Sequence, residues 1–433
     1  MLQLSVCMLA MRLAPRLRLA CPPSPPTCLI RMTAEPPSKF IALMAGEDAV
    51  RPFELDPVVS RPVAWRRSRH ATTDLGERDL TAEISDPAAP HAPPREVHLA
   101  KGLLSRCEVS ALRSAFDALG SGSAAEAAHA RVVVEDGRVV CEELHRLLQP
   151  ALESRILPYV RQRVDYGGGG GEGVVVADAL LRAYREEDRR QALAPHFDVT
   201  SFATVILPLN PGEYEGGLFL QPGADRSSRL LVEPGMQAGD ALLHRFDVMH
   251  GVDASGGDRY SLVLWLSDSA ESVRARATPW LRAAADGGNA YAQFLHGAAL
   301  RSGSGGAARD VGAAAEYWRR AAAQGHALSQ LELGLLYWRG EEGAVPRSVV
   351  ESRRLVTAAA EAGLPAAMAH LGWCEANGKF GERDEAAALG WYERAARQGS
   401  TSAVEALMYG EWSGVRDGVQ FNTRLAREMG TEA

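Results

Sequence analysis

Residues 96–165 carry apolar side chains at the spacing of α-helices. Val109, Leu112, Phe116 and Leu119 recur every three or four positions in the first segment. The second segment, 142–164, has a longer apolar face made of Leu144, Leu147, Leu148, Leu152, Ile156, Val160 and Val164. Because this period places apolar residues on one side of a helix, we predict two amphipathic helices. Five glycines at 167–171 then predict a flexible connector.

The apolar period changes beyond residue 173. Short apolar runs lie at 174–184, 200–209, 218–220, 230–232, 241–243 and 260–266. Turn-forming pairs such as Pro211-Gly212 and Gly256-Gly257 separate these runs. Short strands divided by turns at this density are typical of an antiparallel sandwich or barrel.

From about residue 278 the pattern is helical again and repeats. An Ala-Ala-x-x-Gly unit ends at Gly288, Gly325, Gly363 and Gly399, at intervals of 37, 38 and 36 residues. Further glycines follow at fixed distances, namely Gly297, Gly334 and Gly372, and then Gly303, Gly340, Gly378 and Gly414. This period predicts a solenoid of helix pairs, in which glycines end helices cleanly and let them approach closely.

The N-terminal part has little periodic pattern. Residues 35–95 are rich in Pro, Ala, Arg and Asp, which predicts a mostly disordered linker. Residues 1–34 contain four arginines and no acidic residue, as organelle transit peptides do. An untargeted terminus is the alternative. We therefore expect a leader at 1–34, a linker at 35–95, a strand-rich domain with supporting helices at 96–270, and helical repeats at 278–420.

The composition of the 433 residues narrows the class of protein. The net charge of −7 and the pI near 5.9 give no electrostatic footprint for nucleic acid, so no nucleic-acid partner is expected. Six cysteines without a CxxC pair are too few for a disulfide scaffold and suit a reducing compartment. No apolar run approaches the roughly 20 residues of a membrane-spanning helix. We expect a soluble intracellular protein, with organelle targeting as the alternative to a cytoplasmic location.

Two histidines and a carboxylate stand out in the strand-rich region. His196 and Asp198 are two positions apart, so in a strand both side chains would point into the same interior. We choose His250 over His244 as the second histidine, because its spacing to Arg259 suits two adjoining antiparallel strands. Two histidines and one carboxylate can hold non-haem Fe(II) on one face and leave the opposite coordination positions open.

An arginine completes this set of residues. Arg259 opens the apolar run 260–266, where a charge is costly to bury without a partner. A guanidinium matches a carboxylate through two parallel hydrogen bonds, so Arg259 can anchor the distant carboxylate of a chelating co-substrate. Ser261, two residues further along the same face, can add a hydroxyl. Together these residues indicate an oxygenase.

These motifs carry a family resemblance. Residues 184–265 resemble the prolyl 4-hydroxylase group of Fe(II)/2-oxoglutarate dioxygenases, which have a double-stranded β-helix (jelly-roll) fold. The matching motifs are Tyr184, His196-Phe197-Asp198, Gly216-Gly217-Leu218-Phe219, His250-Gly251-Val252 and Arg259-Tyr260-Ser261. With the preceding helices the resemblance covers about residues 95–268. The chain departs from the family at Ile206-Leu207-Pro208, where members often have a tyrosine, and has Arg259 where collagen-type members have lysine.

The resemblance implies roles for these residues. His196, Asp198 and His250 would bind Fe(II), Arg259 would anchor 2-oxoglutarate, and Tyr184 and Ser261 would add contacts to it. The implied reaction uses O2 and 2-oxoglutarate to hydroxylate a C–H bond, most simply of a prolyl residue in a protein or peptide, and releases succinate and CO2. Ascorbate dependence follows from the resemblance alone. Asp198 argues against halogenation, because halogenating relatives lack this carboxylate.

The repeats resemble Sel-one-like repeats, which are related to tetratricopeptide repeats, most clearly over residues 321–340. This resemblance implies a concave surface that binds a protein partner. We expect the repeat aromatics to pack between helices, namely Trp318, Tyr337, Trp338, Trp373, Trp391 and Tyr392.

The expected fold class is multidomain α+β, with a jelly-roll oxygenase domain followed by an all-α solenoid. Two other functions stay open at this point. One is a catalytically inactive scaffold that acts through its repeats, although His196, Asp198, His250 and Arg259 are all present. The other is a zinc hydrolase that uses the same ligands, although the chain has no HExxH motif to supply a general base.

Overall fold

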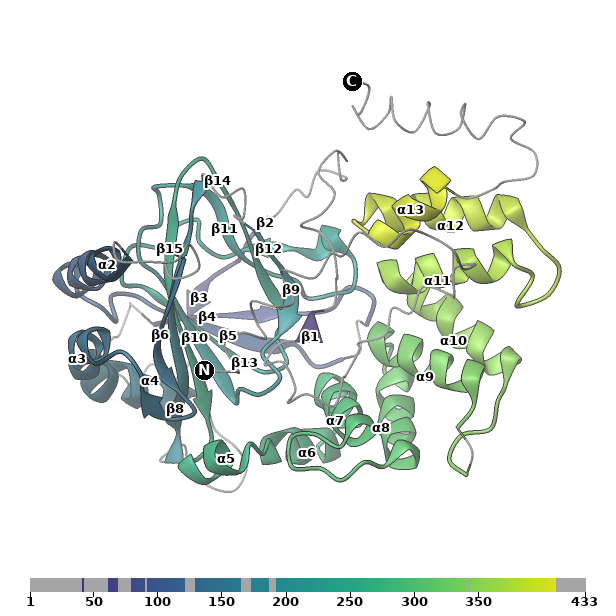
Figure 1. Cartoon of the computed structure of the whole chain (residues 1–433), viewed down its shortest axis with the longest axis horizontal. Helices are drawn as coiled ribbons and strands as arrows, with labels where there is room; N and C mark the ends of the chain where they lie inside the picture. Colours follow the sequence, from purple (N-terminus) through teal and green to yellow (C-terminus); the bar gives the residue numbers. More distant parts are fainter. Residues whose placement is uncertain are drawn as a thin grey trace.

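The computed structural model describes residues 41–42, 61–68, 79–89, 92–120, 129–164, 173–186, 192–341 and 343–409. A strand-rich region stands beside an array of paired helices, and further helices lie on its other side (Figure 1). The predicted leader at 1–34 and the glycines at 167–171 are outside the described residues. None of the helices that the structure describes is long and apolar enough to cross a membrane.

The described strands form two sheets. The smaller sheet contains, in spatial order, β1 (Ile41–Ala42), β9 (Ala192–Phe197), β14 (His250–Ser255), β11 (Glu215–Leu220), β12 (Leu230–Leu231) and β2 (Arg61–Pro62). The larger sheet contains β3 (Arg66–Arg67), β4 (Asp79–Ile84), β5 (Arg95–Ala100), β13 (Ala241–Arg245), β10 (Ala203–Pro208), β15 (Arg259–Ser267), β8 (Val175–Tyr184), β6 (Ala130–Glu135) and β7 (Arg138–Val139). Neighbouring strands are antiparallel, apart from the parallel pair β2 and β12.

Strands β8 to β15 form a double-stranded β-helix, as predicted. The chain crosses from one sheet to the other at each connection, except between β11 and β12, so each sheet receives four of these eight strands. The central order is β9-β14-β11-β12 in one sheet and β13-β10-β15-β8 in the other. Alternate side chains of both sheets therefore face a shared barrel interior.

This crossing corrects one expectation about strand pairing. His250 begins β14 and Arg259 begins β15, but the two strands lie in opposite sheets instead of adjoining each other. Strand β14 pairs with β9 and β11, whereas β15 pairs with β10 and β8. The short spacing between the two residues reflects a tight crossover between sheets, which sequence spacing alone does not distinguish from a hairpin.

The range 35–95 also differs from the disordered linker that its composition predicts. Strands β2, β3 and β4 lie within it, and β4 pairs along its whole length with β5. In β4, Ala82 and Ile84 are buried on one face. These short strands obtain their hydrogen bonds from distant parts of the chain, so local composition gives little sign of them. Of this range the structure describes residues 41–42, 61–68, 79–89 and 92–95, and the remainder lies outside the described residues.

The predicted N-terminal helices cover the outer face of the larger sheet. They are α2 (Arg106–Gly120), α3 (Glu142–Ala151) and α4 (Leu157–Arg163), with the π-helical turn η2 (Leu152–Ile156) joining the last two. Phe116 and Leu148 share one hydrophobic core with Val205 and Leu264 of the sheet. Helical apolar spacing therefore correctly indicated a face that packs on a core.

The C-terminal region consists of antiparallel helix pairs, which α5 (Ala270–Ala275) joins to the barrel. The pairs are α6 (Pro279–Asp286) with α7 (Ala290–Ser302), α8 (Val311–Ala323) with α9 (Ala327–Arg339), α10 (Val349–Glu361) with α11 (Pro365–Ala376), and α12 (Glu385–Arg397) with α13 (Thr401–Tyr409). The four equivalent turn glycines, Gly288, Gly325, Gly363 and Gly399, all have φ between +86° and +95°. Glycine adopts this left-handed conformation without steric cost, which explains the recurring Ala-Ala-x-x-Gly unit.

The second set of repeated glycines lies where helices touch. A Cβ on Gly297 would lie 2.6 Å from Nε1 of Trp318, and one on Gly334 would lie 2.9 Å from Cγ2 of Val356. Trp318 is buried and donates a hydrogen bond from Nε1 to the carbonyl of Phe294. The aromatic residue that we predicted to pack between helices does so here.

The array packs directly on the barrel. The Phe197 and Tyr291 rings lie 5.8 Å apart, and the Tyr291 hydroxyl donates to the carbonyl of Pro222 at 2.9 Å. Asn289, at the start of α7, donates to Asp247 at 2.7 Å. The first repeats consequently share the hydrophobic core of the sheet and its covering helices, whereas the later repeats have a core of their own.

Candidate metal centre and arginine site

Three buried side chains with metal-binding atoms meet at one end of the barrel interior. His196 lies near the end of β9, and His250 is directly opposite it at the start of β14. Asp198 lies beyond the end of β9, in a turn whose backbone hydrogen bond joins Ser201 N–H to the Asp198 carbonyl at 3.0 Å. The expectation that His196 and Asp198 share one strand face is therefore corrected, because the turn, and not the strand period, directs Asp198 inward.

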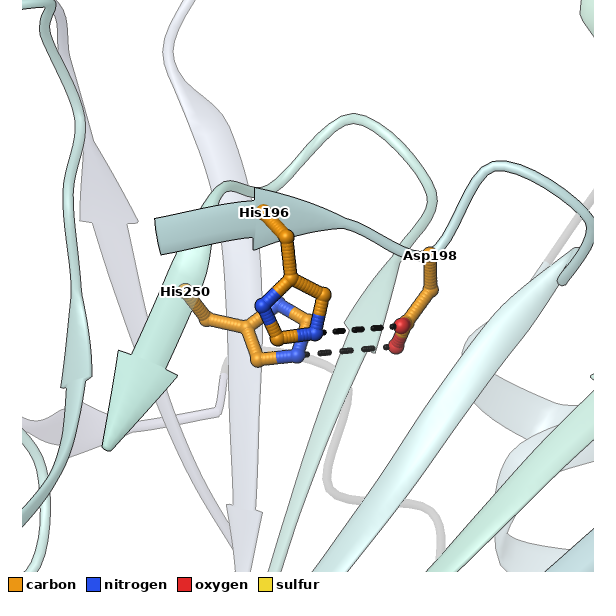
Figure 2. Close-up of side chains that lie close together, drawn as sticks. All are labelled: His196, Asp198 and His250. Carbon is orange, nitrogen blue, oxygen red and sulfur yellow. Dashed lines mark ion pairs between the residues drawn. The ribbon is translucent and has the colours of Figure 1, made fainter. Parts of the chain in front are cut away.

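The geometry of the cluster is compact (Figure 2). Nε2 of His196 is 3.6 Å from Oδ1 of Asp198, and Nε2 of His250 is 3.6 Å from Oδ2 of the same carboxylate. One ligand atom from each residue lies within 4.8 Å of the others. All three residues are at most 4% exposed, so the site is screened from bulk water by the protein itself.

Backbone carbonyls orient both imidazole rings. Nδ1 of His196 is 2.9 Å from the Ala194 carbonyl, and Nδ1 of His250 is 3.2 Å from the Val248 carbonyl. A carbonyl only accepts hydrogen bonds, so each Nδ1 carries the proton and each Nε2 presents a lone pair toward Asp198. Holding the second ring nitrogen in this way is how proteins fix the tautomer of metal-binding histidines.

The carboxylate and His250 also suit a cation. Thr204 donates to Oδ2 of Asp198 at 2.6 Å, whereas Oδ1 is buried without a hydrogen-bond partner among the described residues. Burial, and then the neighbouring His196, lower the pKa of His250 well below its usual value and keep the imidazole neutral. A buried carboxylate oxygen that lacks a donor, beside neutral imidazoles, fits a divalent metal ion.

His244 lies next to this cluster without completing it. Its ring centroid is 4.4 Å from that of His250, and its Nδ1 is 3.0 Å from the Arg245 carbonyl. Burial, and then the neighbouring His250, lower the pKa of His244 to about 3. The group of ligand atoms close enough to share an ion contains His250 and not His244.

Arg259 lies in the same barrel interior and is 1% exposed. Ser261 and Tyr184, which we expected to contact 2-oxoglutarate, lie beside it: Nη1 donates to Oγ of Ser261 at 3.1 Å, and the guanidinium carbon lies 5.3 Å from the centre of the Tyr184 ring. Apolar side chains of both sheets share this interior, including Ile206, Leu218, Leu242 and Val252. Arg259 and the His196–Asp198–His250 cluster are therefore both buried between the same two sheets.

The partner of Arg259 is a residue that the sequence did not reveal. Glu233 accepts from Nε at 3.0 Å and from Nη2 at 2.5 Å, both through Oε1, and its Oε2 accepts a short hydrogen bond from the Tyr214 hydroxyl. Burial alone would lower the pKa of Arg259, but the charge of Glu233 raises it above its usual value. Glu233 stands before Pro234-Gly235, a pattern typical of a solvent-exposed turn, so only the cost of burying Arg259 hinted at a partner.

The helical array matches a known family in sequence. Residues 290–326, 327–364 and 365–400 each match the family described as Sel1 repeat. No curated protein matches the chain as a whole or in part.

Solved structures resemble the two regions separately. A Sel1 repeat protein from Oxalobacter formigenes is 32% identical over 29% of this chain and 92% of that chain, with a TM-score of 0.27. A prolyl hydroxylase in complex with a peptide fragment of the hypoxia inducible factor oxygen degradation domain, from Trichoplax adhaerens, is 19% identical over 42% and 87%, with a TM-score of 0.31. A prolyl-4-hydroxylase from Pseudomonas putida is 20% identical over 39% and 91%, with a TM-score of 0.29.

Proposed function

We propose that this chain, whose residues 290–400 are Sel1 repeats, is an Fe(II)- and 2-oxoglutarate-dependent dioxygenase that hydroxylates a C–H bond of a protein or peptide. The observation that carries the proposal is the buried cluster of His196, Asp198 and His250, with both Nε2 atoms facing the same carboxylate. Two histidines and one carboxylate on one face are typical of non-haem Fe(II) oxygenases.

The chain's own residues would hold and shield the reacting groups. His196, Asp198 and His250 would bind Fe(II), while the Ala194 and Val248 carbonyls keep the rings in the binding tautomer. The apolar interior excludes water from the metal. Bound Fe(II) with 2-oxoglutarate and O2 supplies oxygen-atom insertion, in which a substrate C–H, O2 and 2-oxoglutarate become C–OH, succinate and CO2.

Arg259 would bind the distal carboxylate of 2-oxoglutarate. A guanidinium binds a carboxylate through paired hydrogen bonds, and this one shares the interior with the metal cluster. Tyr184 and Ser261, which contact Arg259, would border the bound carboxylate. Ascorbate would keep the iron reduced between turnovers, a role that the resemblance suggests and no residue encodes.

The substrate class rests on the array and on the sequence motifs. Sel1 repeats belong to the helix-pair solenoids, whose extended surfaces commonly bind proteins. The motifs from Tyr184 to Ser261 resemble those of prolyl 4-hydroxylases, so a prolyl residue is the target that we propose to test first. Another residue type in the same protein partner is compatible with the same metal centre.

A second candidate function is an inactive scaffold. The observation in its favour is that Arg259 already has a carboxylate partner, Glu233, inside the barrel. In that case the barrel would bind neither Fe(II) nor 2-oxoglutarate productively, and the repeats would carry the function.

An anaerobic titration separates the two functions. The full-length, metal-free chain would receive Fe(II) and then 2-oxoglutarate, with the visible charge-transfer absorption of the chelated complex as the readout. We expect this absorption in the wild type and its loss in Asp198→Ala. Asp253→Ala is the matched control, because Asp253 is exposed on the same strand as His250. A wild type that folds but binds no iron would leave the scaffold as the better account.

The same titration tests Arg259. In Arg259→Ala the absorption should require at least about thirtyfold more 2-oxoglutarate, because removing one member of a buried charge pair costs about 2 kcal/mol or more. Arg282→Ala, an arginine that is 75% exposed in its side chain, serves as the control. Circular dichroism must show native helix content in Arg259→Ala, since the change leaves Glu233 buried without its cation.

A further inference from the structure

The Arg259 site already contains a carboxylate, and this bears on how the co-substrate enters. Glu233 is 5% exposed and meets three donors: Nε and Nη2 of Arg259 on Oε1, and the Tyr214 hydroxyl on Oε2. The two guanidinium donors are those that an arginine would offer to the end of a dicarboxylic acid. The position for an anion beside Arg259 is thus filled by the protein's own side chain.

The backbone around Glu233 is shaped to accept it. Gly217 has φ of +107°, and a Cβ there would lie 2.0 Å from Oε2 of Glu233 and 2.5 Å from its Cδ. Any other residue at 217 would therefore remove the space that the carboxylate occupies. Gly217, which the sequence pattern assigned to a turn, instead lies in β11 and leaves the space through which Glu233 reaches Arg259.

Two carboxylates cannot both remain ionised against this one guanidinium without a large cost. Arg259 balances the charge of Glu233 in an interior where charges are poorly screened. A second carboxylate from 2-oxoglutarate would add a net negative charge there, and like charges brought together in such a setting cost several kcal/mol. Binding of the co-substrate therefore requires Glu233 to leave Arg259.

Glu233 has a short route to solvent. It lies in the connection from β12 to β13, where the next two residues, Pro234 and Gly235, are exposed. The turn is held by a hydrogen bond from Met236 N–H to the Glu233 carbonyl at 2.9 Å. Met236 and Ala238 also line a surface groove between this turn and α2. The carboxylate itself is buried, but the turn that follows it borders solvent.

We propose that Glu233 is an internal competitor for Arg259 that sets the affinity for 2-oxoglutarate, so that the co-substrate's distal carboxylate binds only when Glu233 is displaced. This inference rests on the proposed dioxygenase function. It makes Glu233 a residue that determines co-substrate affinity, and it makes the β12–β13 turn part of the binding equilibrium.

The test compares 2-oxoglutarate affinities in the full-length, Fe(II)-loaded chain under anaerobic conditions, again by charge-transfer absorption. Glu233→Gln keeps the shape of the side chain and removes its charge, so it should lower the half-saturating concentration by about tenfold or more. Tyr214→Phe removes one hydrogen bond that retains Glu233, and should lower that concentration by a smaller factor of about three. Glu213→Gln is the control, because Glu213 pairs with Arg113 at the surface next to Tyr214.

The outcomes separate competition by Glu233 from the proposed dioxygenase function. Tighter binding in Glu233→Gln and Tyr214→Phe, with Glu213→Gln unchanged, supports competition. Equal or weaker binding in both variants overturns it and makes Glu233 a residue that positions Arg259, while the dioxygenase function stands. Absence of the absorption in every variant that binds iron removes the 2-oxoglutarate site itself, and the inference with it. Tyr214→Phe keeps the test decisive if Glu233→Gln fails to fold.

Discussion

The barrel and the helical array differ in how far along the chain their contacts reach. In the array each helix pair packs on the next, and the same turn glycine recurs in each of the four described pairs. In the barrel, Tyr184 of β8 pairs with Arg259 of β15, and Arg95 of β5 donates to the Asp247 carbonyl. Local repetition makes the array readable from sequence, whereas the barrel depends on a register that only the folded chain defines.

The boundary between the two hydrophobic cores does not coincide with the boundary between the barrel and the helical array. Trp280, Phe294 and Trp318 of the first repeats belong to the core of the barrel's larger sheet, while Met368 and Tyr392 belong to the separate core of the later repeats. The first repeats are thus helical in sequence pattern but part of the barrel in packing. The comparison therefore predicts two kinds of repeat with different effects on the metal centre.

The largest effect is expected from cutting into the shared core. Trp318→Ala should lower the free energy of unfolding by about 3–5 kcal/mol, because it removes a buried aromatic ring and leaves a cavity. Urea unfolding would be followed by far-ultraviolet circular dichroism and by the absorption of the Fe(II)–2-oxoglutarate complex. The midpoints of both signals should shift to lower urea concentration together.

Tyr392→Ala is the counterpart in the later repeats. It should lower the midpoint of part of the helical signal and leave the midpoint of the metal-centre signal near that of the wild type. Equal shifts of the metal-centre midpoint in the two variants would contradict the division into two cores.

An intermediate effect is expected from acid. Burial, and then the charge of Arg95, lower the pKa of His326 to about 3, whereas an unfolded histidine titrates near about 6.5. Below the unfolded value the unfolded chain binds a proton that the folded chain does not, so stability falls as the pH drops from 6.5 toward 3. At pH 5 the loss should be roughly 2 kcal/mol relative to pH 7.

His326→Asn isolates this contribution. Asparagine keeps an acceptor at the start of α9, where Nδ1 of His326 now accepts from the Ser329 N–H, but it does not titrate. The difference in stability between variant and wild type should therefore change between pH 7 and pH 5, as measured by urea unfolding at each pH. A constant difference would show that His326 does not cause the acid sensitivity.

The smallest effect is expected from replacing glycine by alanine at two equivalent turns of the array. Gly288→Ala should cost about 1 kcal/mol, because alanine strains at φ of +95° although no atom lies within 4 Å of its Cβ. At Gly363, with the same φ, a Cβ would also lie 2.8 Å from Cβ of Asp225 in the barrel. Gly363→Ala should therefore cost roughly 1 kcal/mol more, by thermal or urea unfolding. Equal losses of stability in the two variants would mean that the loop containing Asp225 moves aside at no cost.

The repeats and the clustering of His196 with Asp198 could be predicted because their signals are local. The interval between Gly288, Gly325 and Gly363 follows from one helix pair, and His196 and Asp198 are neighbours along the chain. His250 could be chosen over His244 only through an argument about adjoining strands that the structure does not support. The choice agrees with the geometry because His250 faces His196 across β9 and β14.

The missed features depend on contacts between distant segments. Glu233 reaches Arg259 across 26 residues, and nothing in Glu233-Pro234-Gly235 distinguishes it from an exposed turn. Strand β4 was missed because its local composition resembles that of a linker, whereas it is stabilised by pairing with β5. Buried charge was the one usable signal, because an interior arginine requires an anion and the sequence near Arg259 offers none on the same strand.

Phe197 has a consequence for how the protein can be divided. Its neighbours His196 and Asp198 point into the barrel, while its own ring lies against Tyr291 of the first repeat. The aromatic ring that supports the turn from His196 to Asp198 is thus contributed by the first Sel1 repeat. The array could therefore not be exchanged or shortened freely by domain shuffling. A barrel that ended at residue 270 would lose Tyr291, against which Phe197 of β9 packs. The barrel, as an inheritable unit, extends into the first repeat.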